Sequence, residues 1–134
     1  EINRLEFLEQ PLRSDLHEEA LELKKHSPVF LMADESVTKE EIGSYFPERF
    51  HGINVKMMKA GGYMKAVKQL RQAKILGLKT MLGCMVETSL GISSALNISG
   101  GVDFFDLDGC LLIKEDPFKL VSEENGKIFY SYIQ

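Results

Sequence analysis

The chain has 134 residues, of which 44% are hydrophobic and 27% are charged, a balance typical of one soluble globular domain. The net charge is −4, and acidic and basic residues are interspersed. A nucleic-acid partner is therefore not expected, because nucleic-acid binding needs basic residues clustered on one face. A membrane partner is not expected either, because every apolar run is far shorter than the ~18 residues that a membrane span needs.

The start of the chain and its two cysteines predict the compartment. Glu1 opens a segment that leads directly into an apolar run, without the features of a secretory signal peptide. Cys84 and Cys110 lie far apart and lack CxxC spacing, which favours two reduced thiols over a disulfide. We therefore expect a cytoplasmic protein. The absence of an initiator methionine indicates a fragment or a processed piece, and the oligomeric state is left open, a homo-oligomer included.

Continuous apolar runs alternate with amphipathic segments along the chain. The predicted strands are 5–9, 29–33, 53–57, 79–83 and 102–107. The predicted helices begin at Asp15 (with Glu18 in a capping box), at Thr38 (with Glu41 in another, ending near Phe46), after Gly62 (ending at Gly77) and at about Glu87 (ending at Ser99). Two further strands are predicted at 111–113 and 128–130, with the polar turn 123–126 between them.

Strands without polar alternation, each followed by an amphipathic helix, predict an α/β fold with a parallel sheet. A doubly wound sheet and a (β/α)8 barrel share this order, and the even spacing of the strands, most of which end in a polar residue, favours the barrel. Five strands cannot close a barrel of eight and would leave two open edges. We therefore predict that 1–110 is a partial (β/α)8 barrel, about strands four to eight, that the remaining strands come from outside the chain, and that 111–134 is a C-terminal extension.

Charged side chains follow the carboxyl ends of the predicted strands, where barrel enzymes place their chemistry. They are Glu9, Asp34, Lys56, the segment from Met85 to Glu87, and Asp106 with Asp108. Side chains alternate along a strand, so Asn54 and Lys56 share the face that points into the barrel mouth. Lys59 lies beyond the strand end, where pleating does not determine its direction.

Carboxylates on adjacent strand ends suit a hard cation, so Glu9 and Asp34 are candidate Mg²⁺ ligands. A cation and burial would both favour the neutral amine of Lys56, which could then remove a proton next to a carboxylate. Each residue alone has an ordinary structural explanation: strand-end carboxylates commonly cap helices, and a lysine is commonly solvated or ion-paired. The joint pattern favours the catalytic hypothesis. The three histidines fall away from the strand ends and are expected at the surface.

Four stretches carry a resemblance to a known family: 7–11 (FLEQP), 33–36 (ADES), 54–62 (NVKMMKAGG) and 83–87 (GCMVE). Together they resemble the enolase superfamily, whose sites use Mg²⁺ with a lysine or histidine base, and most closely its muconate-lactonizing subgroup. The resemblance implies that Glu9 and Asp34 are metal ligands and that Lys56, rather than Lys59, is one of two acid/base lysines.

The pair Asp106 and Asp108 resembles the Asp-x-Asp of dipeptide epimerases of the L-Ala-D/L-Glu type, where it binds the substrate ammonium group. Met85 and Glu87 are expected to contact the substrate, although Met85 alone is typical of rim packing. The implied function is an Mg²⁺-dependent dipeptide epimerase, an isomerase that inverts an α-carbon by lysine-mediated 1,1-proton transfer through an enediolate. The implied partner is a small-molecule dipeptide.

The resemblance also implies what lies upstream of Glu1: the second catalytic lysine, the third metal ligand and a capping domain toward which 111–134 would pack. Two alternatives stay open. One is an N-acylamino acid racemase or a muconate-type cycloisomerase of the same superfamily. The other belongs to a different class: an inactive half-barrel fragment or assembly partner.

Overall fold

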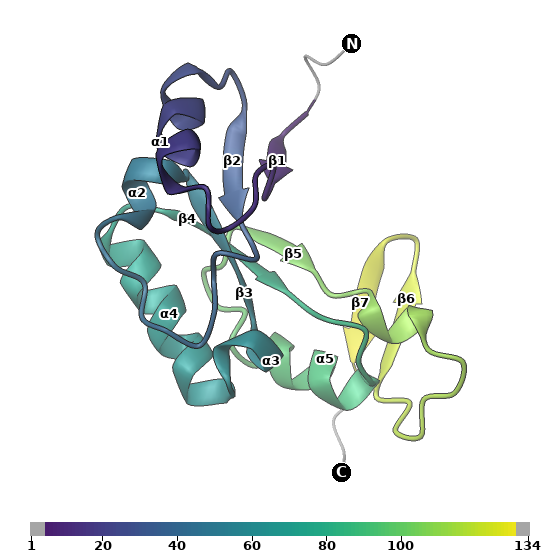
Figure 1. Ribbon diagram of the computed structural model, residues 1–134. Coiled ribbons are helices and arrows are strands. Elements are labelled where there is room, and N and C mark those ends of the chain that lie inside the picture. Colours follow the sequence, from purple (N-terminus) through teal and green to yellow (C-terminus); the bar gives the residue numbers. More distant parts are fainter. Residues whose placement is uncertain (1–4, 131–134) are drawn as a thin grey trace.

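Five parallel strands form one sheet in the computed structural model, which describes residues 5–130 (Figure 1). The strands are β1 (Phe7–Glu9), β2 (Phe30–Ala33), β3 (Gly52–Lys56), β4 (Lys79–Gly83) and β5 (Phe104–Asp106), paired in that order. The Phe7 and Phe104 rings, from the two outermost strands, have centroids 5.3 Å apart. In a flat sheet these strands would be roughly 19 Å apart. The sheet is therefore strongly curled, as part of a (β/α)8 barrel requires.

Helices cover the outer, convex face of the sheet (Figure 1). They are α1 (His17–His26), α2 (Phe46–Arg49), α3 (Met57–Ala60), α4 (Tyr63–Ile75) and α5 (Ser89–Leu96). The main core lies between the two layers, where Ile53 and Val55 of β3 pack with Ala66 and Leu70 of α4. The alternation of the strands sends these apolar side chains outward and the polar ones to the concave face. Within residues 5–130, no helix is long and apolar enough to cross a membrane.

Two glycines leave room for long side chains on the concave face. A Cβ at Gly52 would lie 2.9 Å from the sulfur of Met32, and a Cβ at Gly83 would lie 2.3 Å from Oδ1 of Asn54. The curl of the sheet brings the side chains of the concave face close together. The space next to each glycine is therefore filled by a side chain from a neighbouring strand. Asn54 is thereby completely buried just below the carboxyl ends of the strands.

A short hairpin follows the sheet and packs beside α5 (Figure 1). Its strands are β6 (Val121–Glu124) and β7 (Lys127–Tyr130), and Val121 and Ile128 contact a second core cluster that contains Leu107 and Ile92. The strand predicted at 128–130 is confirmed, but the one predicted at 111–113 is wrong. Leu111 and Leu112 belong to the 3₁₀-helix η2 (Gly109–Leu112), Ile113 is its C-cap, and 121–124 pairs with β7 instead. A domain boundary at 110 and packing of 111–134 toward a capping domain stay predictions, and residues 1–4 and 131–134 lie outside the described part.

Both predicted capping boxes are wrong. The first helix begins at His17 after the N-cap Leu16, and Asp15 accepts hydrogen bonds from Arg13 instead of capping. The helix predicted from Thr38 does not form, and α2 instead begins at Phe46 with Pro47 in its first turn. The helix from Thr38 fails to form because side chains from a distant part of the chain bind the backbone of this segment.

Side chains of α4 bind the backbone of this connection. Gln69 Nε2 donates to the carbonyl oxygens of Thr38 and Glu40, at 2.6 and 2.7 Å, and the backbone N–H of Ile42 donates to Gln72 Oε1 at 3.1 Å. These bonds satisfy backbone groups that a helix would otherwise pair, so the segment is stable as a loop.

Other element ends shift by a few residues. Met57 begins α3 rather than ending the third strand, α5 covers less than the predicted 87–99, and β5 is shorter than 102–107. The cysteines are both free, as predicted, and both are buried. His51 is not a surface residue: it is half-buried, and its Nδ1 accepts a hydrogen bond from the Leu31 N–H at 3.0 Å, which ties the start of β3 to β2.

Candidate active site

Two lysines converge on one carboxylate at the carboxyl ends of β2 and β3. The Lys56 ammonium donates to Asp34 Oδ2 at 2.9 Å, and the Lys59 ammonium donates to Asp34 Oδ1 at 2.5 Å and also to the Asp34 carbonyl oxygen. The side chains of Lys56, Asp34 and Lys59 are 13%, 12% and 21% exposed. The predicted neighbours Lys56 and Asp34 are therefore in direct contact and largely withdrawn from solvent.

Lys59 is a residue that the sequence reasoning set aside. It reaches Asp34 because α3 begins directly after Lys56, which places Lys56 at the N-cap and Lys59 within the first turn. Residues three apart lie on neighbouring positions of a helix surface. The spacing of the two lysines, together with a helix that starts without a loop, is the signal that would have indicated this contact.

The charges around Asp34 shift its pKa and that of Lys56 in opposite directions. Burial raises the pKa of Asp34, but the hydrogen bonds from Lys59 and Lys56 outweigh burial and lower it. Burial lowers the pKa of Lys56, but the hydrogen bond and charge of Asp34, with the charges of Glu9 and Asp106, raise it on balance. Asp34 therefore stabilises the ammonium form of Lys56, and a neutral Lys56 beside a bound cation stays a prediction.

Glu9 is connected to the same region through two amide side chains. Asn54 Nδ2 donates to Glu9 Oε1 at 2.7 Å across the intervening strand β2. Gln10 Oε1, from the residue after Glu9, accepts the backbone N–H groups of Asp34 and Ser36 at 3.0 and 3.1 Å. Gln10 adopts a left-handed φ of 37°, which is unusual for a residue other than glycine. These two amides link the ends of β1, β2 and β3. The sequence placed Asn54 on this face, but neither amide was predicted to have a role.

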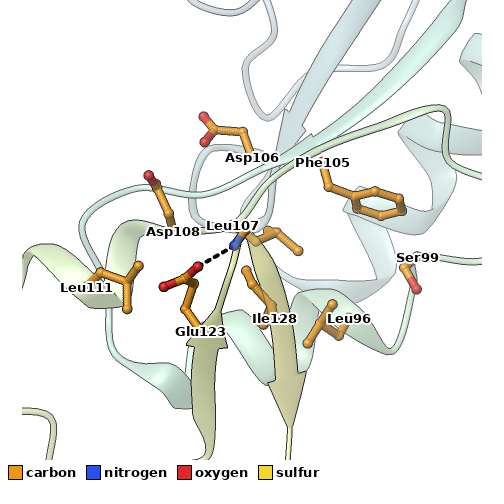
Figure 2. Close-up of a pocket in the computed structure, with 10 residues that line it drawn as sticks. Leu96, Ser99, Phe105, Asp106, Leu107, Asp108, Leu111, Glu123 and Ile128 are labelled. Carbon is orange, nitrogen blue, oxygen red and sulfur yellow. Dashed lines mark hydrogen bonds between the residues drawn. The ribbon is translucent and has the colours of Figure 1, made fainter.

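Asp106 and Asp108 extend from the end of β5, which lies next to β4 and two strands from Lys56. Figure 2 shows both carboxylates on one side of the strand and the Phe105 ring on the other, as their shared parity predicts. Burial, followed by the negative charge of Asp108, raises the pKa of Asp106. Such a pair of carboxylates is suited to bind a cationic group.

A cavity of about 550 Å³ lies beside this pair, between β5, the end of α5 and the hairpin (Figure 2). Its walls include Phe105, Leu107 and Ile128, and the Glu123 carboxylate at its rim accepts the Gly126 N–H. The cavity reaches Asp106 and Asp108, but Glu9, Asp34 and Lys56 do not line it. It therefore adjoins the candidate ammonium site and is separate from the lysine–carboxylate cluster.

Met85 and Glu87 lie in the loop between β4 and α5. The Glu87 carboxylate accepts the Met85 N–H at 3.2 Å through Oε1. Its other oxygen, Oε2, would lie only 1.9 Å from a Cβ at Gly91, so the glycine leaves the space that this side chain needs. Glu87 therefore turns back onto its own loop and stabilises it. The Met85 side chain is 43% exposed and free to contact a ligand. Substrate contacts of these two residues stay a prediction.

The described residues offer oxygen ligands for Mg²⁺ but do not form a complete site. Glu9 keeps Oε2 without a hydrogen-bond partner in the described part of the chain, and Asp34 can use a second lone pair on each oxygen. No group of three or more His, Cys, Asp or Glu side chains that could hold a metal occurs within residues 5–130. Two hard donors on adjacent strands fit Mg²⁺ in kind, provided that a further ligand comes from elsewhere.

Residues 1–107 match the enolase C-terminal domain-like family, and the chain belongs to that family. The curled parallel sheet with helices on its outer face is the corresponding part of a (β/α)8 barrel.

Particular relatives are dipeptide epimerases. The chain is 41% identical over 128 residues to an L-Ala-D/L-amino acid epimerase of Flavobacterium johnsoniae, covering 95% of this chain and 38% of the relative. It is 42% identical over 122 residues to an L-Ala-D/L-Glu epimerase of Bacteroides thetaiotaomicron, covering 91% and 32%. The chain thus spans less than two fifths of the length of these relatives.

A solved structure has the same fold. It is an enolase family member from Agrobacterium tumefaciens with homology to dipeptide epimerases, crystallised with sodium and L-Ala-L-Glu. The TM-score is 0.86 and the identity 35%, over 97% of this chain and 39% of that one. These similarities confirm the predicted superfamily and the predicted resemblance to dipeptide epimerases.

Proposed function

We propose that this chain is the carboxyl-terminal part of an Mg²⁺-dependent dipeptide epimerase of the enolase superfamily. The observation that carries the proposal is the buried contact between the Lys56 ammonium and the Asp34 carboxylate, at 2.9 Å, on the strand ends that also carry Glu9 and Asp106. The similarity to enzymes named as L-Ala-D/L-amino acid and L-Ala-D/L-Glu epimerases supports the same reaction class.

The candidate site residues form two charged regions, which would bind different parts of the substrate. Asp106 and Asp108 would bind the ammonium group at the amino end of a dipeptide, since ionised carboxylates form strong charge-assisted hydrogen bonds with it. Glu9 and Asp34 would hold Mg²⁺, which supplies a positive charge beside the carboxylate of the residue being inverted. Met85 lies at the rim, where its exposed side chain could contact the substrate.

Lys56 would carry the proton at its Nζ. Burial lowers the pKa of Lys56, but the hydrogen bond and charge of Asp34 raise it on balance, so its ammonium form can donate a proton to one face of the α-carbon. Neutralisation of the Asp34 charge by a bound cation would favour the neutral amine, which can accept a proton. A second lysine on the opposite face, from outside this chain, would complete the inversion.

The test is α-proton exchange in deuterated water, catalysed by the full-length protein that carries this chain. K56A is expected to abolish exchange in at least one stereochemical direction, as monitored by proton NMR of each dipeptide epimer. K65A is the matched control, because Lys65 is an exposed lysine on the outer helix α4. Survival of exchange from both epimers in K56A would show that the role of Lys56 is wrongly assigned.

A further inference from the structure

Asn54 is a completely buried polar residue on the concave face of the sheet, and no step proposed above uses it. Its amide nitrogen donates to Glu9 Oε1 at 2.7 Å. The orientation of the amide is determined by this contact, because an ionised carboxylate accepts hydrogen bonds and cannot donate them. The oxygen Oδ1 is consequently left buried without a hydrogen-bond partner among the described residues.

Stability alone does not account for this arrangement. A buried amide oxygen without a partner costs free energy of folding, whereas a leucine of similar size would leave no such atom. The position also needs space: a Cβ at Gly83 would lie 2.3 Å from Asn54 Oδ1. Asn54 therefore has an unpaired, buried oxygen and needs a glycine at position 83 to fit. Among the described residues, the hydrogen bond that its side chain makes is the one to Glu9.

The bond reaches from β3 to β1 across β2, which makes it a long-range constraint on an edge strand. β1 has only three residues, and the Glu9 side chain is exposed on it. A glutamate in such a position would otherwise sample several rotamers. Binding by Asn54 at Oε1 restricts the carboxylate and leaves Oε2 as the oxygen without a partner in the described part of the chain.

We propose that Asn54 is a positioning residue that orients the Glu9 carboxylate for Mg²⁺. The inference rests on the proposed function, since it needs Glu9 to be a ligand. Residues that hold metal ligands in place commonly change metal affinity or activity by ~10- to 100-fold when replaced. Asn54 is expected to act through the affinity for the metal, and only through Glu9.

The test is isothermal titration calorimetry of MgCl₂ into the full-length protein. N54L is expected to raise the dissociation constant of Mg²⁺ by ~10- to 100-fold. T80V is the matched control: Thr80 is equally buried on β4, but its hydroxyl donates to Asp103 near the start of that strand. Only T80V is expected to lower the melting temperature, because it removes a hydrogen bond to Asp103, and only N54L is expected to weaken Mg²⁺ binding.

A double-mutant cycle separates positioning from a general loss of structure. If Asn54 acts through Glu9, adding N54L to E9Q changes the Mg²⁺ affinity far less than N54L changes it in the unaltered protein. If N54L does not fold, N54S takes its place, because serine is too short to reach Glu9 and leaves room for water.

Three outcomes overturn the inference. Unchanged Mg²⁺ affinity in N54L or N54S refutes the positioning role and leaves the proposed function intact. Additive effects of N54L and E9Q refute it in the same way. Absence of Mg²⁺ binding to the unaltered protein refutes the proposed metal chemistry and the positioning role together.

Discussion

At the scale of single residues, two lysines and a pair of aspartates occupy different parts of the row of strand ends, the lysines at the central strand and the aspartates at an edge strand. Lys56 and Lys59 meet at Asp34 beside β2 and β3, whereas Asp106 and Asp108 lie at the end of β5. A dipeptide is a zwitterion with an ammonium at one end and a carboxylate at the other. In the proposed function, Asp106 and Asp108 would bind the ammonium end of such a substrate.

Replacing Asp106 and Asp108 together by asparagine should weaken binding of dipeptides with a free amino end. Loss of charge-assisted hydrogen bonds worth about 1.5–3 kcal/mol corresponds to roughly a 10- to 100-fold rise in KM. Steady-state kinetics on a dipeptide and on its N-acetylated analogue, which has no ammonium, measures the effect. Equal weakening of both would contradict an ammonium site and favour a racemase of acylated substrates.

The raised pKa of Asp106 adds a pH signature to the same experiment. A carboxyl group with a raised pKa becomes neutral at a higher pH than an ordinary aspartate as the solution is acidified. Affinity for the dipeptide should therefore decline earlier on acidification in the unaltered protein than an ordinary aspartate would predict. In D106N this component of the pH dependence should be absent.

At the scale of elements, Asp103 attaches the start of β5 to the start of β4. Its carboxylate accepts the Thr80 N–H at 2.9 Å, the Thr80 hydroxyl at 3.0 Å and the Lys79 ammonium at 2.7 Å. Burial raises the pKa of Asp103, but these bonds outweigh burial and lower it. Its contribution to stability is therefore fully present above the pKa of an unfolded aspartate and is lost as the pH falls through the lower, folded pKa.

D103A should lower the free energy of unfolding of the full-length protein by about 1–3 kcal/mol at pH 7, because the buried Thr80 groups lose their acceptor. The difference between D103A and the unaltered protein should shrink on acidification below about pH 4. Urea titrations at several pH values measure both effects. D15A is the control, since the Arg13–Asp15 pair is exposed and should contribute little. A pH-independent difference would count against the assigned charge state.

The same scale shows which elements the sequence could predict. The strands followed from their apolar runs, and the 79–83 strand has the predicted ends, because the helices bury its outward face. The helix predicted from Thr38 failed because Gln69 and Gln72, some thirty residues later, bind that backbone. Local capping signals carry no information about such distant partners.

For the site, alternation along β3 was sufficient to direct Asn54 and Lys56 to one face and toward the carboxylates. Lys59 could not be placed this way because its direction depends on the first turn of α3 rather than on pleating. The raised pKa of Lys56 could likewise not be predicted from the sequence, because it depends on how closely Asp34 approaches the ammonium. The alternation of residues along a strand thus predicts on which side of the sheet a side chain lies, whereas tertiary contacts determine the charge state of that side chain.

At the scale of the whole molecule, the curled sheet ends in two strands, β1 and β5, each with one neighbouring strand in the described part of the chain. Leu8 and Phe105 on these strands are 39% and 53% exposed. Open edges with apolar side chains are templates for association with other chains. In the full-length protein, we expect further barrel strands to cover both.

The 134-residue chain expressed alone should therefore self-associate, and sedimentation velocity over a range of concentrations should show species larger than the monomer. Because the association is attributed to the edges, L8K and F105K should suppress it, since charges on edge strands oppose pairing. I75K is the matched control: Ile75 is 84% exposed, but it lies at the end of the outer helix α4, away from both edges. A chain that stays monomeric at all concentrations, or that I75K alone makes monomeric, would contradict the expectation that further strands complete this sheet.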